Sequence, residues 1–125
     1  MQATKFQVLV IDDEIAFLQA LTRAFRNDEK IRFETHTSPR MALRLLESGR
    51  YHALLTDWKM PTINGSEFLS LAAQRFPEVP RGLITGVAEL KEVSTAVNNA
   101  RLTWVFLKPI QMQSFRFQLL KELES

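Results

Sequence analysis

Near its amino terminus the chain reads Phe6-Gln7-Val8-Leu9-Val10-Ile11-Asp12-Asp13, an almost wholly apolar run that ends in two adjacent carboxylates. A short run this rich in apolar and β-branched residues is typical of a strand buried on both faces of a parallel sheet. Apolar residues then recur at helical spacing, at Ile15, Leu18, Leu21 and Phe25. The pattern predicts a buried strand, an acidic loop and an amphipathic helix.

The same alternation continues to the end of the chain. Short apolar runs alternate with longer stretches whose apolar residues recur every three or four positions. Five strands alternating with five helices predict a parallel sheet with right-handed crossovers and helices on both faces. We expect strands at residues 6–11, 31–36, 53–56, 81–85 and 103–107, and helices from Ile15 to about Asn27, from Ser38 to Gly49, from the end of the loop at 57–65 to Pro77, at 89–100, and from Gln111 to the carboxyl terminus.

Composition and charge narrow the class of protein. A chain of 125 residues, 46% hydrophobic and 24% charged, has the size and apolar content of one folded domain. The absence of cysteine excludes a disulfide framework, a thiolate nucleophile and any Cys-ligated metal site. The net charge is +2, with basic and acidic residues interspersed and no long apolar segment. Neither nucleic acid nor a membrane is therefore expected as a direct partner, and we expect a cytoplasmic protein.

Polar residues stand where the predicted strands end. Asp12 and Asp13 follow the first strand, Asp57 follows the third, Thr85 closes the fourth and Lys108 follows the fifth. Because the carboxyl ends of parallel strands meet at one edge of a sheet, these side chains should lie together. Three carboxylates and one lysine leave a formal charge of about −2, which calls for a divalent cation, and oxygen ligands favour Mg²⁺, or Mn²⁺, over zinc or copper. Since lysine and threonine can bind an anion, the pattern predicts a phosphoryl-binding site.

These residues resemble the receiver domains of two-component response regulators. The resemblance covers nearly the whole chain and rests on the joint order and spacing of motifs that are each weak alone. It implies a flavodoxin-like three-layer α/β fold of (βα)5 type with sheet order 2-1-3-4-5, in which residues 1–125 form one receiver domain and no output domain is present in this chain. The motifs are Asp12-Asp13, Asp57 with Met60-Pro61 and Gly65, Thr85-Gly86, and Lys108-Pro109.

The resemblance assigns a phosphoacceptor and a metal site. Asp57 would attack a phosphoryl group and become an aspartyl phosphate. Asp12, Asp13, Asp57 and the backbone carbonyl of Lys59 would hold Mg²⁺, and the side chain of Lys59 would modulate hydrolysis of the phosphoryl group. The domain is therefore expected to be a signalling switch and not an enzyme, assisting only its own phosphotransfer and autodephosphorylation.

The resemblance also assigns the groups that sense the phosphoryl group. Lys108 would pair with one phosphoryl oxygen, and the Thr85 hydroxyl would bond another and move the loop that follows. The family carries an aromatic residue three positions before the lysine, where this chain has Val105. Trp104 and Phe106 flank that position and should point to the opposite face of the sheet. We hypothesise that one of them contributes to a surface made by the fourth helix and fifth strand. The resemblance implies a partner-binding surface around the fourth helix, fifth strand and fifth helix.

Several partners and alternatives follow from this resemblance. The expected phosphodonor is a phosphohistidine on a sensor histidine kinase or phosphotransfer protein. The expected recipient of the signal is a downstream effector, a missing output domain or a second copy in a phosphorylation-dependent homodimer. The main alternative is a receiver-like interaction scaffold that is not regulated by phosphorylation, which Val105 keeps open. Two weaker alternatives need motifs that do not follow the first strand of this chain. A haloacid-dehalogenase-like phosphohydrolase would need Asp-x-Asp there, and a nucleotide-binding flavodoxin-like domain would need a Gly-rich loop.

Each motif alone also has a purely structural explanation. Asp12-Asp13 would suit the amino terminus of a helix, Asp57 a turn, and Lys108 a solvated strand end. Their convergence on one edge of the sheet favours the functional explanation. On the last helix, the apolar spacing predicts that Phe115 is part of the core and that Phe117 is exposed.

Overall fold

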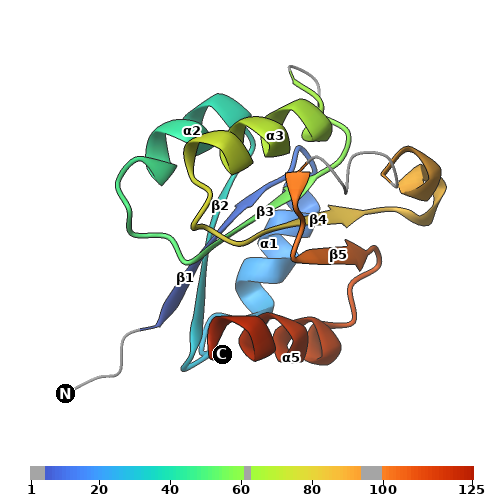
Figure 1. Cartoon of the computed structure of the whole chain (residues 1–125). Coiled ribbons are helices and arrows are strands. Elements are labelled where there is room, and N and C mark those ends of the chain that lie inside the picture. Colours follow the sequence, from blue (N-terminus) through green and yellow to red (C-terminus); the bar gives the residue numbers. More distant parts are fainter. Residues whose placement is uncertain (1–4, 61–62, 94–99) are drawn as a thin grey trace.

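A five-stranded parallel sheet in the order β2-β1-β3-β4-β5 forms the centre of the molecule (Figure 1). The structure is a computed structural model that describes residues 5–60, 63–93 and 100–125. The expected flavodoxin-like α/β fold and its strand order are confirmed. Its elements are β1 (Phe6–Ile11), α1 (Ile15–Ala24), β2 (Ile31–His36), α2 (Pro39–Leu46), β3 (Ala53–Asp57), α3 (Gly65–Arg75), β4 (Arg81–Thr85), η1 (Val87–Glu89), β5 (Trp104–Leu107) and α5 (Met112–Leu123).

The element boundaries differ from the expected ones by a few residues. Helix α1 ends at Ala24, before the expected Asn27, and β3 extends by one residue to include Asp57. Residues 90–93 and Ala100 are helical, whereas 94–99, the middle of the helix expected at 89–100, lie outside the described residues. Of the helices in the described part of the chain, none is long and apolar enough to cross a membrane.

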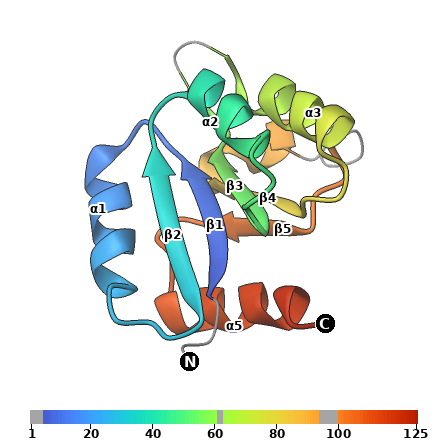
Figure 2. The same ribbon diagram turned by 90° about the vertical axis from the view of Figure 1, so that its left-hand side faces the viewer.

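Helices cover both faces of the sheet, as Figure 2 shows from the side of β2. Helices α1 and α5 lie on one face, and α2 and α3 lie on the other. Alternation along β1 assigns its side chains to the two faces, since Val8 and Val10 belong to the core cluster under α1 and α5 while Leu9 and Ile11 belong to the cluster under α2 and α3. Strand β1 is therefore buried on both faces, which explains the continuous apolar run from Val8 to Ile11.

Trp104 and Phe106 lie in the core beneath α5 and form no part of an exposed surface. They are only 6% and 5% exposed, and their rings stack at 6.3 Å between centroids. Phe106 also meets Phe115 of α5 edge to face at 4.7 Å. The hypothesis that either residue contributes to a partner surface is therefore wrong. The expected orientation opposite to Val105 is correct, but α5 covers that face of the strand.

The amino terminus of α2 and the surface of α5 follow the sequence pattern. The Ser38 hydroxyl accepts a hydrogen bond from the Met41 N–H at 3.3 Å and so caps α2, with Pro39 at its first position. On α5, Phe115 is buried and Phe117 is 68% exposed, as its spacing predicts.

Arg81 anchors the end of the sheet opposite to the carboxyl ends of the strands. It is 4% exposed at the start of β4, and its guanidinium donates to five backbone carbonyls. Burial, and then the charge of Arg101, lower the pKa of Arg81. Because the carbonyls belong to the segments before β4 and before β5, this one cation holds the two incoming connections together. They are those of Phe76, Pro77, Val79, Ala100 and Arg101.

Candidate functional site

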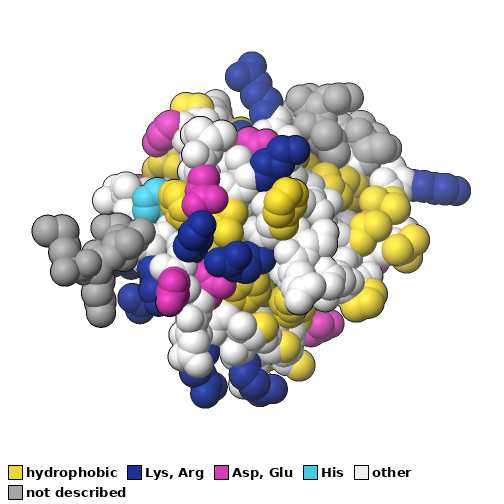
Figure 3. Space-filling view, turned by 90° about the horizontal axis from the view of Figure 1, so that it is seen from below, with side chains coloured by type: hydrophobic (Ala, Val, Ile, Leu, Met, Phe, Trp, Pro, Cys, Tyr) yellow, Lys and Arg dark blue, Asp and Glu magenta, His cyan; other side chains and the backbone are white. Residues whose placement is uncertain are grey.

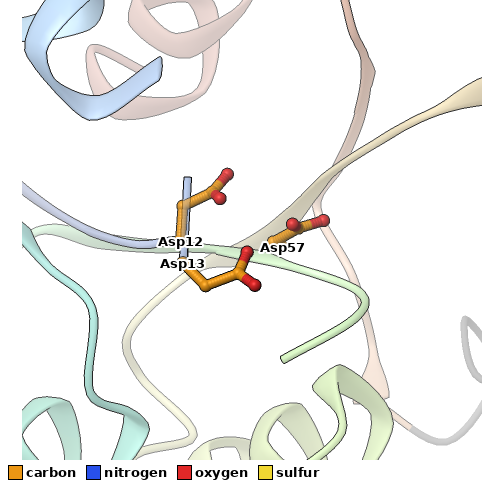
Figure 4. Close-up of side chains that lie close together, drawn as sticks. All are labelled: Asp12, Asp13 and Asp57. Carbon is orange, nitrogen blue, oxygen red and sulfur yellow. The ribbon is translucent and has the colours of Figure 1, made fainter. Parts of the chain in front are cut away.

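Three carboxylates converge at the carboxyl edge of the sheet, as Figure 4 shows. Asp12 and Asp13 follow β1, and Asp57 ends the adjacent strand β3. One carboxylate oxygen from each lies within 4.8 Å of the others. Asp12 is fully buried, Asp57 is partly buried and Asp13 is exposed. The expected convergence of the acidic residues is therefore present, with the buried oxygens at the back of the site and the exposed ones at its opening.

Backbone hydrogen bonds at the strand ends hold the acidic residues in position. The Asp12 N–H donates to the His36 carbonyl of β2 at 3.2 Å, which extends the β1–β2 ladder by one residue. The Asp12 Oδ1 atom accepts the N–H of Glu14 at 2.8 Å, and the Asp57 Oδ1 atom accepts the N–H of Trp58 at 2.7 Å. The carboxylates of Asp12 and Asp57 are thus held by hydrogen bonds from their own loops.

Lys108 supplies the positive charge of the site. Its Nζ atom lies 2.8 Å from Asp12 Oδ2, 3.8 Å from Asp57 Oδ2 and 3.9 Å from Glu14 Oε1. The ammonium also lies 4.5 Å from the centroid of the Phe17 ring. Burial lowers the pKa of Lys108, but the close ion pair with Asp12 and the charges of Asp57 and Glu14 outweigh burial and leave the pKa above its ordinary value. Lys108 is therefore a cation whose nearest partner is Asp12.

The electrostatics of Asp57 favour a bound cation or a proton. Burial is the largest cause of its perturbation, and the nearby charge of Asp12 acts in the same direction. Together they raise the pKa of Asp57 to about 6, against the opposing charge of Lys108 and the N–H of Trp58. A divalent cation would relieve the repulsion among these carboxylates, so the donor set fits Mg²⁺ or Mn²⁺.

Thr85 presents a buried hydroxyl at the same edge of the sheet. It ends β4 and is 1% exposed, and its Oγ1 atom has no hydrogen-bond partner among the residues that the structure describes. Its carbonyl accepts the N–H of Lys108 at 2.8 Å, which ties the ends of β4 and β5 together. An unpaired buried hydroxyl is unfavourable, and an anion at this edge would give it a partner.

The sequence prediction missed several groups around the site. Glu14 and Phe17 both approach Lys108, and their only signal in the sequence is closeness to the acidic pair. Trp58 is buried beside Asp57, although it stands in a segment that reads as a turn. The side chain of Lys59 is exposed, and the roles predicted for its carbonyl and its side chain stay predictions.

The fold and the site together define a parallel α/β domain with an acidic, lysine-containing site at the carboxyl ends of its strands. The family model of the response regulator receiver domain matches residues 8–119. The chain therefore belongs to the response regulator receiver domain family, whose members act as signalling switches.

Two curated relatives and one solved structure illustrate the similarity. The hydrogenase transcriptional regulatory protein HoxA of Cupriavidus necator is 36% identical over 102 residues, which cover 82% of this chain and 21% of the relative. HoxA of Bradyrhizobium diazoefficiens is 32% identical over 104 residues, or 83% of this chain and 21% of the relative. The chain thus spans about a fifth of the length of these relatives.

The solved structure supports the fold alone. It is the signal receiver domain of an HD domain-containing protein from Pseudomonas fluorescens Pf-5, with a TM-score of 0.87 and 24% identity. The superposition covers 97% of this chain and 96% of that one.

Proposed function

We propose that this domain accepts a phosphoryl group on Asp57 from a phosphohistidine of a sensor histidine kinase or phosphotransfer protein, in a Mg²⁺-dependent reaction. The observation that carries the proposal is the meeting of three carboxylates within 4.8 Å with Lys108 at 3.8 Å from Asp57. In this proposal the domain is a phosphorylation-controlled switch that works in the cytoplasm.

The chain's own residues supply most of the proposed chemistry. An oxygen of the Asp57 carboxylate attacks phosphorus, the bond from phosphorus to the imidazole nitrogen breaks, and the electron pair of that bond stays on the nitrogen. Asp12, Asp13, Asp57 and the carbonyl of Lys59 would hold Mg²⁺. When bound, the metal ion supplies positive charge that neutralises phosphoryl oxygens. Because the ionised form of Asp57 is the nucleophile, a general base is not required.

Lys108 and Thr85 would recognise the attached phosphoryl group. In this proposal Lys108 moves its charge from Asp12 toward a phosphoryl oxygen, since its Nζ already lies between the two carboxylates. The unpaired Thr85 hydroxyl donates to another phosphoryl oxygen. Because Thr85 directly precedes Gly86 and η1, its movement would alter that loop.

The signal would be read on a surface near the ends of β4 and β5. Val87, Leu90, Val105 and Leu107 are exposed apolar residues of η1, of the helical residues 90–93 and of β5. Figure 3 shows hydrophobic side chains gathering on the side of the molecule where these elements lie. We propose this surface for an effector, an output domain or a second copy of the chain, with Val105 in place of the earlier candidates Trp104 and Phe106.

A titration with Mg²⁺ and beryllofluoride tests this function, because beryllofluoride imitates a phosphoryl group on a carboxylate. Trp58 lies next to Asp57 in the chain, so tryptophan fluorescence should change on addition of Mg²⁺ and change further with beryllofluoride. An Asp57→Asn variant should lose the second change. An unaltered signal in the unsubstituted protein, or an equal second change in the variant, would contradict the proposal.

A further inference from the structure

The side chain of Trp58 connects the Asp57 loop to the helical residues 90–93. Its ring is 8% exposed and packs in a cluster with Leu69 of α3, Leu83 of β4 and Val93. Its indole Nε1 donates a hydrogen bond to Glu92 Oε2 at 2.8 Å. A buried aromatic ring with a single polar atom is thus held at that atom by a residue 34 positions further along the chain.

The backbone of the same residue is tied to the phosphoacceptor. The Trp58 N–H donates to Asp57 Oδ1 at 2.7 Å, and the Trp58 carbonyl accepts the N–H of Gly65 at 2.7 Å. Both bonds are short, and the second holds the amino terminus of α3 against this loop. Trp58 therefore contacts the Asp57 carboxylate through its backbone and Glu92 through its side chain.

This arrangement makes Trp58 a rigid link. A change in the charge or position of the Asp57 carboxylate alters the hydrogen bond that the Trp58 N–H makes. The ring cannot follow freely, because it is enclosed by the side chains of α3 and β4 and fixed at Nε1. A displacement of the Trp58 backbone must therefore either move Glu92 with it or break the hydrogen bond.

Among the described residues, strand β5 offers no comparable link between the Asp57 loop and the surface. Val105 of β5 has no polar side-chain atom and is 39% exposed, and the aromatic residues on either side of it pack beneath α5. The hydrogen bond from Trp58 to Glu92, in contrast, joins the Asp57 loop directly to residues 90–93.

We propose that the hydrogen bond between Trp58 and Glu92 couples the state of Asp57 to residues 90–93, and thereby to the exposed apolar surface beside them. Trp58 and Glu92 are positioning residues, because neither would bond the phosphoryl group through its side chain. The inference rests on the proposed function of Asp57 and adds a route by which that site communicates with its surface. By linkage, a bond that changes on modification of Asp57 must also change the affinity of the site for a phosphoryl mimic.

Calorimetric titration with beryllofluoride in saturating Mg²⁺ measures that affinity directly. The variants are Glu92→Ala, which removes the acceptor; Trp58→Phe, which removes the donor but keeps a ring; and the double variant. Glu92→Gln removes the charge but keeps an acceptor oxygen. Glu122→Ala removes an exposed carboxylate from α5 and is the matched control for net charge. Urea unfolding of each variant measures stability separately.

If the hydrogen bond couples the two regions, removing its donor or its acceptor should shift the affinity for beryllofluoride in the same way. Glu92→Ala and Trp58→Phe should change the beryllofluoride dissociation constant in the same direction by about three- to tenfold, the range that one hydrogen bond supplies. The double variant should show no more than the larger single effect, while Glu92→Gln and Glu122→Ala stay close to the unsubstituted protein.

Two results would overturn the inference. If the single variants lose stability but keep their affinity within about twofold, the bond is structural only. If the two effects multiply in the double variant, the residues act independently. Failure of the unsubstituted protein to bind beryllofluoride would overturn the proposed function and the inference together, and this result is distinguishable because it does not involve the variants.

Discussion

At Asp57, burial and neighbouring charge oppose the ionised form that the proposed chemistry needs. The pKa of about 6 means that a proton or a cation is bound more readily here than at an ordinary aspartate. The unfolded chain has no such cost, since its Asp57 would titrate near the ordinary value of 3.8. The free energy of unfolding is therefore lower at a pH where Asp57 is ionised than at a pH where it is protonated.

Asp57→Asn should stabilise the metal-free domain at neutral pH. The group has a raised pKa in the folded state, so its cost is absent below about pH 3.8, grows as pH rises through 6 and is complete above it. With the Asp57 side chain only 16% exposed, the gain should be about 1–3 kcal/mol at pH 8 and should vanish near pH 4. Urea unfolding at both pH values measures it. Equal stability of the two proteins at pH 8 would contradict the proposed electrostatics.

Lys108→Met should increase the affinity for Mg²⁺ while slowing phosphorylation. The substitution removes the positive charge that lies 2.8 Å from Asp12 and 3.8 Å from Asp57. The remaining carboxylates then attract a divalent cation more strongly, by about three- to tenfold in dissociation constant. Calorimetric titration with Mg²⁺ checks this, with Lys121→Met on the exposed side of α5 as the control. A weaker affinity than that of the unsubstituted protein would show that Lys108 does not compete with the cation.

Individual site residues were predictable to different degrees. Asp12, Asp13, Asp57, Thr85 and Lys108 were predictable because each stands at a strand end, and the topology alone brings strand ends together. The choice of Asp12 as the nearest partner of Lys108 depends on side-chain geometry, which spacing does not encode. The unpaired state of the Thr85 hydroxyl is likewise visible only after packing.

Among the elements, α3 starts unusually close to the phosphoacceptor loop. A Cβ atom on Gly65 would lie 2.7 Å from the carbonyl oxygens of both Asp57 and Trp58. The contacts involve backbone atoms, which cannot swing aside as a side chain could. The glycine that the sequence pattern singled out is thus required by close approach, since its φ is not in the left-handed region.

Gly65→Ala should destabilise the domain and disturb the site. We expect a loss of about 1–3 kcal/mol from overpacking, together with weaker Mg²⁺ binding because the Asp57 loop must shift. Ser70→Ala, at an exposed position of the same helix, is the control and should change stability by less than about 0.5 kcal/mol. Urea unfolding and Mg²⁺ titration of both variants test this. Equal effects of the two substitutions would refute the steric explanation.

The helices and strands were largely predictable from the sequence, whereas the helix that packs on each face of a strand was not. The periodicities of two and of three to four residues identified the strands and most of the helices, and the alternation of β5 placed Trp104 and Phe106 on one face. The sequence period does not say which helix lies over that face. Contact with Phe115 of α5 decides it, and such a contact joins residues that pattern reasoning treats separately.

The molecule as a whole has a reactive edge and an anchored edge. The carboxyl ends of its strands carry the repelling carboxylates, while Arg81 secures the connections at the other end through five carbonyl bonds. The repelling carboxylates therefore destabilise the fold at one edge, and the hydrogen bonds of Arg81 stabilise it at the other. Ligands at the reactive edge should therefore stabilise the whole domain.

Mg²⁺ should raise the melting temperature of the domain, and less so in acid. At a hundred times its dissociation constant, a cation that binds only the folded state stabilises it by about 2.7 kcal/mol. Below pH 6, protonation of Asp57 competes with the metal, so the shift should shrink. Thermal unfolding at pH 7.5 and pH 5 measures both effects, with Asp13→Asn as a variant that should lose the shift. A shift that is independent of pH and of Asp13 would indicate a different metal site.

Intact mass spectrometry after incubation with Mg²⁺ and acetyl phosphate tests the proposed phosphorylation most directly. We predict a gain of one phosphoryl group that is labile to base, absent without metal and absent in Asp57→Asn. A gain that persists in Asp57→Asn would contradict the assignment of the phosphoacceptor. The absence of any gain, together with no detectable Mg²⁺ binding, would contradict the account as a whole and favour a receiver-like scaffold that acts by binding alone.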